Sequence, residues 1–213
     1  MKPLILASHS PRRKKLLKQI GMKFRIIPSR AAEVFFSHQS PGENAQRIAL
    51  EKAIDVSARL QRGIVIGADT IVVLDHHVLG KPKSKDDAKR MLRLLSGREH
   101  SVFTGFALKD VETGRQTTGV EETKVRFRKL TEKEISDYVN SGSPMDKAGS
   151  YGIQDDFGAV FIERVNGCFY NVVGFPIARF YSTLQQFAAD MEPHPERDLS
   201  HRKTSNERMD SVQ

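Results

Sequence analysis

We expect the fold to form around Ile64-Val65-Ile66-Gly67-Ala68-Asp69-Thr70-Ile71-Val72-Val73-Leu74, an apolar run that contains one carboxylate. Its β-branched residues predict a buried strand. A charged side chain in such a run must be paired, bind a metal or face a cleft, because burying it alone is costly. We expect Asp69 to face a cleft and to act there. The alternative is a structural aspartate at a strand end that bonds the next turn.

The composition is that of a globular protein, with 213 residues of which 38% are hydrophobic and 28% charged. This length suffices for one sizeable core or for two small lobes that share a sheet. No apolar run reaches the roughly 18 residues of a membrane span, and the apolar start is too short for a signal peptide. Cys168 is the only cysteine, which argues against an internal disulfide and favours a reducing, cytoplasmic setting.

The net charge of +8 favours an anionic partner, such as a nucleotide, a nucleic acid or an acidic surface. Tryptophan is absent and aromatic residues make up 8% of the chain, so a stacking surface for single-stranded nucleic acid is not expected. The sequence also contains no recognised nucleic-acid motif, and nucleic acid is therefore the least favoured of these partners.

A cationic helix start follows the first predicted strand. Ser10 followed by proline is typical of a helix N-terminus, which predicts a helix over residues 11–20. The helix dipole disfavours cations in the first turn, yet Arg12 and Arg13 lie there. We therefore expect these arginines to bind an anion together with Ser8 and the free N–H groups of the helix start. The alternative is a basic face in contact with solvent.

The rest of the chain contains further strand and helix patterns. Further strands are expected at residues 3–7, 24–28, 101–108 and 120–127, and further helices at residues 41–60, 84–95, 131–140 and 176–187. The Asn166-Gly167 turn predicts a hairpin between residues 159–165 and 169–173. Residues 188–213 are polar and lack apolar periodicity, which predicts a disordered tail.

Lys52 lies on or beside the apolar stripe of the predicted helix over residues 41–60, because it follows Ile48 by one helical turn. Such a lysine either extends its ammonium to water or reaches into a site, and the spacing alone leaves both open. The adjacent His76 and His77 have no third ligand at a suitable spacing, so we expect no metal site there.

Cations, carboxylates and a flexible loop together suggest a nucleotide site. The cations are the helix start, Lys52 and Lys81, and the carboxylates are Glu33 and Asp69. A glycine-spaced polar loop ends at Gln154 and allows close approach of a ligand. Cations bind phosphate oxygens, and carboxylates hold a hard metal or activate water, as a triphosphate with a divalent ion requires. The sequence contains neither a P-loop nor a Rossmann glycine pattern.

Six motifs lie in order across residues 3–185, and they read Ala7-Ser8-His9-Ser10-Pro11-Arg12-Arg13, Gly67-Ala68-Asp69-Thr70, Leu79-Gly80-Lys81-Pro82, Leu95-Ser96-Gly97-Arg98-Glu99-His100, Asp146-Lys147-Ala148-Gly149-Ser150-Tyr151-Gly152-Ile153-Gln154 and Asn171-Val172-Val173-Gly174-Phe175-Pro176. Together they resemble the Maf family of nucleoside triphosphate pyrophosphatases, also called septum formation inhibitor proteins. The resemblance implies an α/β fold with a long twisted mixed β-sheet flanked by helices, as in inosine triphosphate pyrophosphatases. Residues 1–187 would form a single catalytic domain of two lobes with a central cleft.

The resemblance also implies an activity and roles for individual residues. The enzyme would hydrolyse a nucleoside triphosphate to the monophosphate and pyrophosphate, with Mg²⁺, Mn²⁺ or Co²⁺ as cofactor. Asp69 would be the general base, and Glu33 and Asp69 would hold the metal. The phosphates would be bound by Ser8, Arg12, Arg13, Lys52 and Lys81.

The same resemblance implies a pyrimidine substrate. In the branch that prefers dTTP and UTP, the residues at Arg12, Thr70 and Gln154 are tied to base choice, and this sequence carries that trio. Modified pyrimidine triphosphates are equally consistent, and a homodimer is implied as well. The expected role is the cleaning of nucleotide pools, with a link to the arrest of cell division.

Two other classes of function remain open from the sequence. One is a regulator of septum formation that binds a nucleotide without hydrolysing it, and the other is a nucleic-acid-binding protein. Magnesium-dependent release of pyrophosphate from dTTP or UTP would distinguish the enzyme from the first. Binding to random DNA or RNA with a steep dependence on salt would identify the second.

Overall fold

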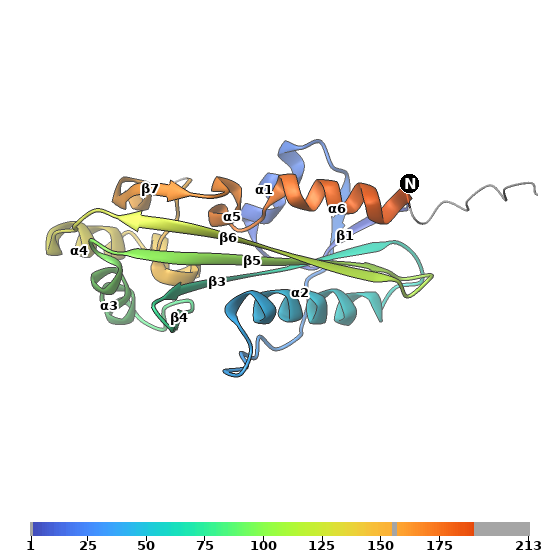
Figure 1. Cartoon of the computed structure of the whole chain (residues 1–213), viewed down its shortest axis with the longest axis horizontal. Helices are drawn as coiled ribbons and strands as arrows, with labels where there is room; N and C mark the ends of the chain where they lie inside the picture. The colour runs from blue at the N-terminus through green and yellow to red at the C-terminus, as the bar shows by residue number, and fades with distance from the viewer. Residues whose placement is uncertain (1, 155–156, 190–213) are drawn as a thin grey trace, which may run out of the picture.

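The computed structural model describes residues 2–154 and 157–189, and it contains a seven-stranded mixed sheet (Figure 1). The strand order is β2-β1-β3-β5-β6-β7, and β4 pairs with β3. The strands β1 and β2 and the strands β1 and β3 are parallel, whereas the other pairs are antiparallel. The bounds are β1 Leu4–Leu6, β2 Phe24–Ile26, β3 Ile64–Leu74, β4 His77–Leu79, β5 Glu99–Asp110, β6 Gln116–Phe127 and β7 Ile162–Asn166.

Helices cover both faces of this sheet, which confirms the predicted α/β fold with a mixed sheet. Figure 1 shows α2 on one face, α1, α5 and α6 on the other, and α3 and α4 at one end of the long strands. Their bounds are α1 Pro11–Gln19, α2 Pro41–Ser57, α3 Lys85–Leu95, α4 Glu132–Asn140, α5 Phe169–Val173 and α6 Ile177–Ala189. None of the helices in the described ranges has the length and apolar character needed to cross a bilayer.

Local sequence signals determine where these helices begin. Ser10 caps α1 by accepting a hydrogen bond from the Arg13 backbone, as the sequence predicts. The capping boxes of Ser40 with Glu43 and of Thr131 with Glu134 start α2 and α4. The helix α2 ends at Ser57, three residues before the predicted end.

Two glycines let α2 lie directly on the sheet. A Cβ added at Gly67 of β3 would lie 1.9 Å from the carbonyl oxygen of Ala49, and one at Gly105 of β5 would lie 2.3 Å from the backbone of Ala45. Only glycine permits so close an approach of a helix backbone to a strand. The strand β3 therefore continues through Gly67, and α2 is held where its Lys52 side chain overlies this strand.

One edge of β3 is only partly paired. Along the other edge, β5 pairs with β3 from Ile64 to Val73. The first edge pairs with β1 at residues 64–66 and with β4 at residues 72–74. Among the described residues, no strand pairs with residues 67–71 on this edge, and Asp69 lies in the gap.

The hairpin predicted near the C-terminal end of the described residues was wrong. Residues 157–161 form a 3₁₀ helix and residues 169–173 form α5, so the predicted hairpin of residues 159–165 with 169–173 does not form among the described residues. Instead, β7 pairs with β6. The helical backbone lets the Asn171 amide donate to the Val102 carbonyl and the Thr123 hydroxyl at 2.9 Å each.

The predicted C-terminal tail is also corrected in part. The last helix continues through Ala188 and Ala189, two residues that the sequence assigns to the tail. The remainder of the predicted tail, residues 190–213, lies outside the described residues.

Candidate active site

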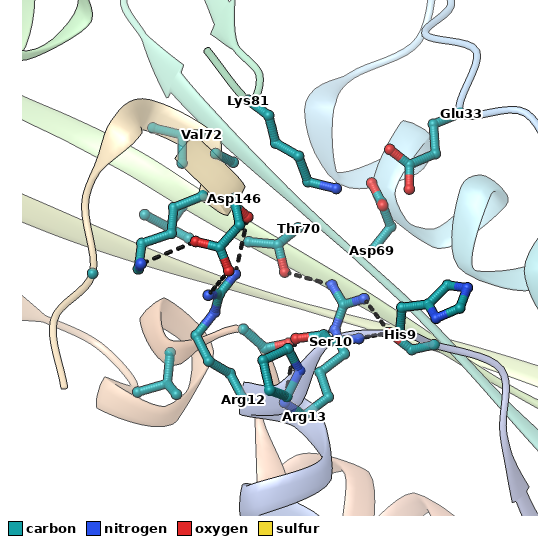
Figure 2. A pocket seen from close by; sticks show the side chains of 18 of the residues that line it. His9, Ser10, Arg12, Arg13, Glu33, Asp69, Thr70, Val72, Lys81 and Asp146 are labelled. Carbon is teal, nitrogen blue, oxygen red and sulfur yellow. Dashed lines mark hydrogen bonds and ion pairs between the residues drawn. The ribbon is translucent and has the colours of Figure 1, made fainter. Parts of the chain in front are cut away.

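A cavity of about 370 Å³ opens beside the gap in the pairing of β3. Its wall combines the end of β1, the start of α1, the segment after β2, α2, β3 and the loop over residues 146–154. The cavity brings together all nine residues that the sequence analysis selects, namely Ser8, Arg12, Arg13, Glu33, Lys52, Asp69, Thr70, Lys81 and Gln154. Figure 2 shows the side chains of Glu33, Asp69 and Lys81 directed toward one another.

Lys52 bridges the two carboxylates of the site. Its Nζ lies 2.7 Å from Asp69 Oδ1 and 2.6 Å from Glu33 Oε1. The side chains of Lys52 and Asp69 are 9% and 11% exposed, whereas that of Glu33 is 51% exposed. Of the two interpretations of Lys52, the structure therefore supports the one in which it reaches into the site. Asp69 lies within β3 and not at its end, which rules out the structural alternative.

The charge of Lys52 affects the titration of Glu33. Burial pushes the pKa of the Glu33 carboxyl upward, but the hydrogen bond and charge of Lys52 outweigh it, so that the pKa is lowered. The charges of Lys81 and Arg13 add to this lowering. Glu33 is therefore ionised at neutral pH, which a carboxylate needs in order to bind a metal ion.

Arg13 is committed to bonds within the protein. Its Nε donates to the Gly174 carbonyl at 3.0 Å, and Nη1 donates to the Ala68 carbonyl at 2.9 Å and to the Ser8 hydroxyl at 3.2 Å. Its Nη2 donates to Thr70 Oγ1 at 3.0 Å. Burial lowers the pKa of this guanidinium, and the negative charges of Asp69 and Glu33 oppose the effect. Arg13 thus joins α1, β3 and the turn after α5 at the back of the site.

Arg12 is held from the opposite wall of the cavity. Its Nη1 lies 2.7 Å from Asp146 Oδ2, and its Nη2 donates to the Asp146 carbonyl at 3.2 Å. Lys147 Nζ lies 3.0 Å from the other carboxylate oxygen of Asp146. Burial raises the pKa of Asp146, but the bonds from Lys147 and Arg12 outweigh it and lower the pKa. The first helical turn and the loop over residues 146–154 are therefore joined across the cavity.

Two further groups face the cavity without a partner among the described residues. Lys81 makes no hydrogen bond or ion pair there, and Figure 2 shows its ammonium directed into the cavity. The Gln154 side-chain oxygen is buried and accepts no hydrogen bond from the described residues. A buried acceptor without a donor is costly unless a ligand supplies one.

The site could hold a divalent cation together with a ligand. The described residues contain no group of three or more His, Cys, Asp or Glu side chains arranged as a metal cage. Glu33 and Asp69 supply two carboxylates at the cavity wall. Magnesium is commonly bound by one or two carboxylates plus substrate phosphates and water, so this donor set fits it.

Several residues of the cavity were not selected from the sequence. Asp146 and Lys147 occur in a polar loop that the sequence analysis identifies as ligand-facing, but nothing local indicates that Asp146 contacts Arg12. Tyr151 also lines the cavity, and its hydroxyl lies 2.7 Å from Nε2 of the buried His100. Burial lowers the pKa of His100 to about 3, so it is neutral at physiological pH. The residue pattern around His100 in β5 does not indicate a contact with Tyr151.

Comparison with known proteins finds chains that are similar over most of this sequence. A protein of Syntrophomonas wolfei named dTTP/UTP pyrophosphatase is 47% identical over 179 residues, covering 84% of this chain and 94% of the relative. A Bacillus cereus protein of the same name is 47% identical over 191 residues, covering 90% of this chain and 98% of the relative. A solved Mycobacterium abscessus structure, a nucleoside-triphosphatase / dITP/XTP pyrophosphatase, matches with a TM-score of 0.42 and 15% identity, covering 89% of this chain and 98% of that one.

A protein-family model also matches this chain. The model is described as Maf-like protein, and it matches residues 3–187. This range contains every residue of the cavity described above. On the match over this range and on the identity to its relatives, the chain belongs to the Maf family.

Proposed function

We propose that this protein is a nucleoside triphosphate pyrophosphatase that hydrolyses dTTP and UTP to the monophosphate and pyrophosphate. The names of the relatives support the reaction and the substrates. The observation that carries the proposal is the Lys52 ammonium between Asp69 and Glu33 in a cavity rich in cations. Modified pyrimidine triphosphates have the same groups and belong to the same substrate class.

The phosphates would lie along the cationic wall of the cavity. Lys81 has an ammonium that points into the space, and Arg12 and Lys52 line it as well. Ser8 stands at the end of β1, where its hydroxyl accepts hydrogen bonds from the Ser10 backbone and from Arg13. Fixed cations near the leaving pyrophosphate stabilise the charge that develops in the transition state. Arg13 contributes mainly through the position of its neighbours, because at least four of its N–H groups are already engaged.

Glu33 and Asp69 would hold a divalent cation, Mg²⁺ being the best fit and Mn²⁺ or Co²⁺ alternatives. Such an ion neutralises phosphate charge and lowers the pKa of a bound water. The carboxylate oxygens that Lys52 does not contact, Glu33 Oε2 and Asp69 Oδ2, are the donors left for this purpose. Lys52 orients both carboxylates, because one ammonium contacts an oxygen of each.

Asp69 is the proposed general base. Its carboxylate takes a proton from a water molecule whose oxygen forms a bond to the α-phosphorus. The bond between the α-phosphorus and the bridging oxygen breaks, and pyrophosphate leaves with that oxygen and its electron pair. A carboxylate in this position contributes roughly 10²-fold or more to the rate.

The decisive experiment is a pyrophosphate-release assay on dTTP, UTP, CTP, ATP and GTP, with and without Mg²⁺. We expect turnover of dTTP and UTP that depends on Mg²⁺. Asp69→Asn should lower kcat by about 10²-fold while the far-ultraviolet circular dichroism stays unchanged. Asp137→Asn, at an exposed carboxylate of α4, is the matched control and should retain full activity. Binding of dTTP without hydrolysis would instead favour the nucleotide-binding regulator.

The organisation of the chain is part of the proposal. Two large hydrophobic clusters support a single catalytic domain of two lobes over residues 1–187, one around Phe106 and Phe180 and one around Phe127 and Phe161. The exposed apolar side chains of residues 34–36 would suit a homodimer contact, which light scattering tests. The single cysteine suits a cytoplasmic setting.

A further inference from the structure

Two threonines form a cross-strand pair directly behind the site. Thr70 of β3 and Thr104 of β5 are paired in the antiparallel register, and their Oγ1 atoms lie 3.0 Å apart. Thr70 lines the cavity, whereas Thr104 is fully buried and does not line it. Thr104 Oγ1 also lies 3.1 Å from the carbonyl oxygen of Asn171 in α5.

The ends of this hydrogen-bonded chain determine its direction. Arg13 Nη2 can only donate, and it donates to Thr70 Oγ1 at 3.0 Å. The Asn171 carbonyl can only accept, so the Thr104 hydroxyl uses its single hydrogen to donate to this carbonyl. The bond between the two threonines must then use the proton of Thr70. The order of donation is Arg13, Thr70, Thr104 and Asn171.

This order leaves Thr70 with one free lone pair and no free proton. A hydroxyl has one donor and two acceptor sites; the bond to Thr104 takes the donor, and the bond from Arg13 takes one acceptor. Toward the cavity, Thr70 can therefore accept a hydrogen bond but cannot donate one. Gln154 presents a second acceptor in the same cavity, and no described residue donates to its side-chain oxygen.

We propose that Thr104 is a positioning residue for substrate choice, because it keeps the Thr70 hydroxyl an acceptor that selects the N3–H imide of uracil or thymine. The unprotonated N3 of cytosine is itself an acceptor and would face the Thr70 lone pair without a proton between them. This inference rests on the proposed function and deepens it. It assigns selectivity to a residue that touches neither the substrate nor the cavity.

The test compares kcat/KM for UTP and CTP in wild type, Thr104→Val and Thr104→Ser. Valine has the shape of threonine but cannot accept a hydrogen bond, so the Thr70 hydroxyl becomes free to donate to N3 of cytosine. We expect the UTP-to-CTP ratio to fall roughly five- to tenfold in Thr104→Val, the worth of one neutral hydrogen bond, and to recover in Thr104→Ser. A ratio that stays at the wild-type value in folded Thr104→Val overturns the proposal.

The matched control is Thr123→Val. Thr123 is equally buried, and its hydroxyl bonds Cys168 and Asn171 but not Thr70. Its loss should leave the UTP-to-CTP ratio unchanged. A fall equal to that of Thr104→Val would attribute the effect to general loosening of the core and overturn the assignment to Thr104.

Substrate analogues separate the base from the sugar and do not depend on a variant that folds. A ribose hydroxyl could also donate to Thr70, so UTP is compared with 2′-deoxy-UTP and with N3-methyl-UTP in the wild-type protein. We expect a strong loss for the N3-methyl compound and little change for the deoxy compound; the reverse pattern overturns the proposal. Absence of UTP and dTTP turnover in the wild type would refute the proposed function itself, which is a separate outcome.

Discussion

Replacement of Lys52 by methionine tests the centre of the site most directly. The change keeps an unbranched side chain of similar length but removes the ammonium that lies 2.7 Å from Asp69 and 2.6 Å from Glu33. Asp69 is then left nearly buried without its ion-pair partner. Breaking a buried ion pair in this way costs about 3–5 kcal/mol, and we expect the lower value because the Glu33 side chain is half exposed. A loss of about 3 kcal/mol corresponds to a Tm lower by about 6–12 °C.

Equilibrium unfolding in guanidinium chloride at neutral pH measures this loss, and Lys133→Met is its control. Lys133 Nζ lies 2.7 Å from Asp137 Oδ2, the same separation as in the Lys52–Asp69 pair, but these side chains are 85% and 60% exposed. Exposed pairs add little to stability, so the control should unfold at the wild-type midpoint. The comparison isolates burial, because the length of the ion pair is held constant.

Two more measurements on Lys52→Met follow from the same geometry. The value of kcat/KM for UTP should fall by roughly 10²-fold, because a fixed cation is lost beside the proposed phosphate site. Mg²⁺ should raise the Tm of the variant more than that of the wild type, because both carboxylates are then free to bind the ion. If Lys52→Met unfolds at the midpoint of the Lys133→Met control, the buried ion pair is not a feature of the protein in solution.

Three further predictions concern the packing, the pH dependence and the cross-cavity contact. Gly67→Ala should destabilise the protein by more than about 3 kcal/mol in denaturant unfolding, because its Cβ would overlap the backbone of α2. Burial lowers the pKa of His100 to about 3, so between about pH 6.5 and pH 3 the unfolded state binds a proton that the folded state does not. The stability present above pH 6.5 is therefore lost as the pH falls. Unfolding titrations should show that the wild type loses about 2 kcal/mol more than His100→Gln between pH 7 and pH 5. Asp146→Ala should raise KM for UTP more than it lowers kcat, since it frees Arg12 without touching Asp69; a fall in kcat alone would place Arg12 in the transition state instead.

Sequence signals predicted those parts of the fold that depend on neighbours along the chain. The starts of α1, α2 and α4 were predicted correctly, because the side chains of Ser10, Ser40 and Thr131 each accept a hydrogen bond from the backbone N–H three residues later. Residues 169–173 were misassigned because Phe-Tyr-Asn-Val-Val is rich in strand-forming residues. Their helical form depends on the bonds of Asn171 to two other strands, which no local pattern encodes.

The same distinction applies to the site. Asp69 was predictable because an isolated charge in an apolar strand needs a partner or a cleft. The identity of that partner was not predictable, since the spacing of Lys52 allowed two directions for its side chain. The contact of Arg12 with Asp146 joins residues 134 positions apart, and the Thr104 bond depends on the register of two strands.

The gap in the pairing of β3 explains why these distant groups converge. Without a neighbouring strand at residues 67–71, the Ala68 carbonyl accepts from Arg13 Nη1 at 2.9 Å and lies 3.5 Å from Lys52 Nζ. A buried carbonyl requires a hydrogen-bond donor, and here Arg13 of α1 and Lys52 of α2 both donate to the Ala68 carbonyl. The backbone therefore helps to hold α1 and α2 around the cavity.

The alternation of side chains along β3 places Asp69 and Thr70 on opposite faces of the strand. Successive side chains of β3 point to opposite faces, so Asp69 meets Lys52 of α2 while Thr70 meets Arg13 of α1. A ligand at a fully paired strand could contact only one of these faces, but a ligand at the open edge can contact both. The proposed general base Asp69 and the proposed base-selecting Thr70 are thus adjacent in sequence but are held by different helices. Substitutions behind Thr70 should therefore change which base is accepted while the proton transfer at Asp69 continues.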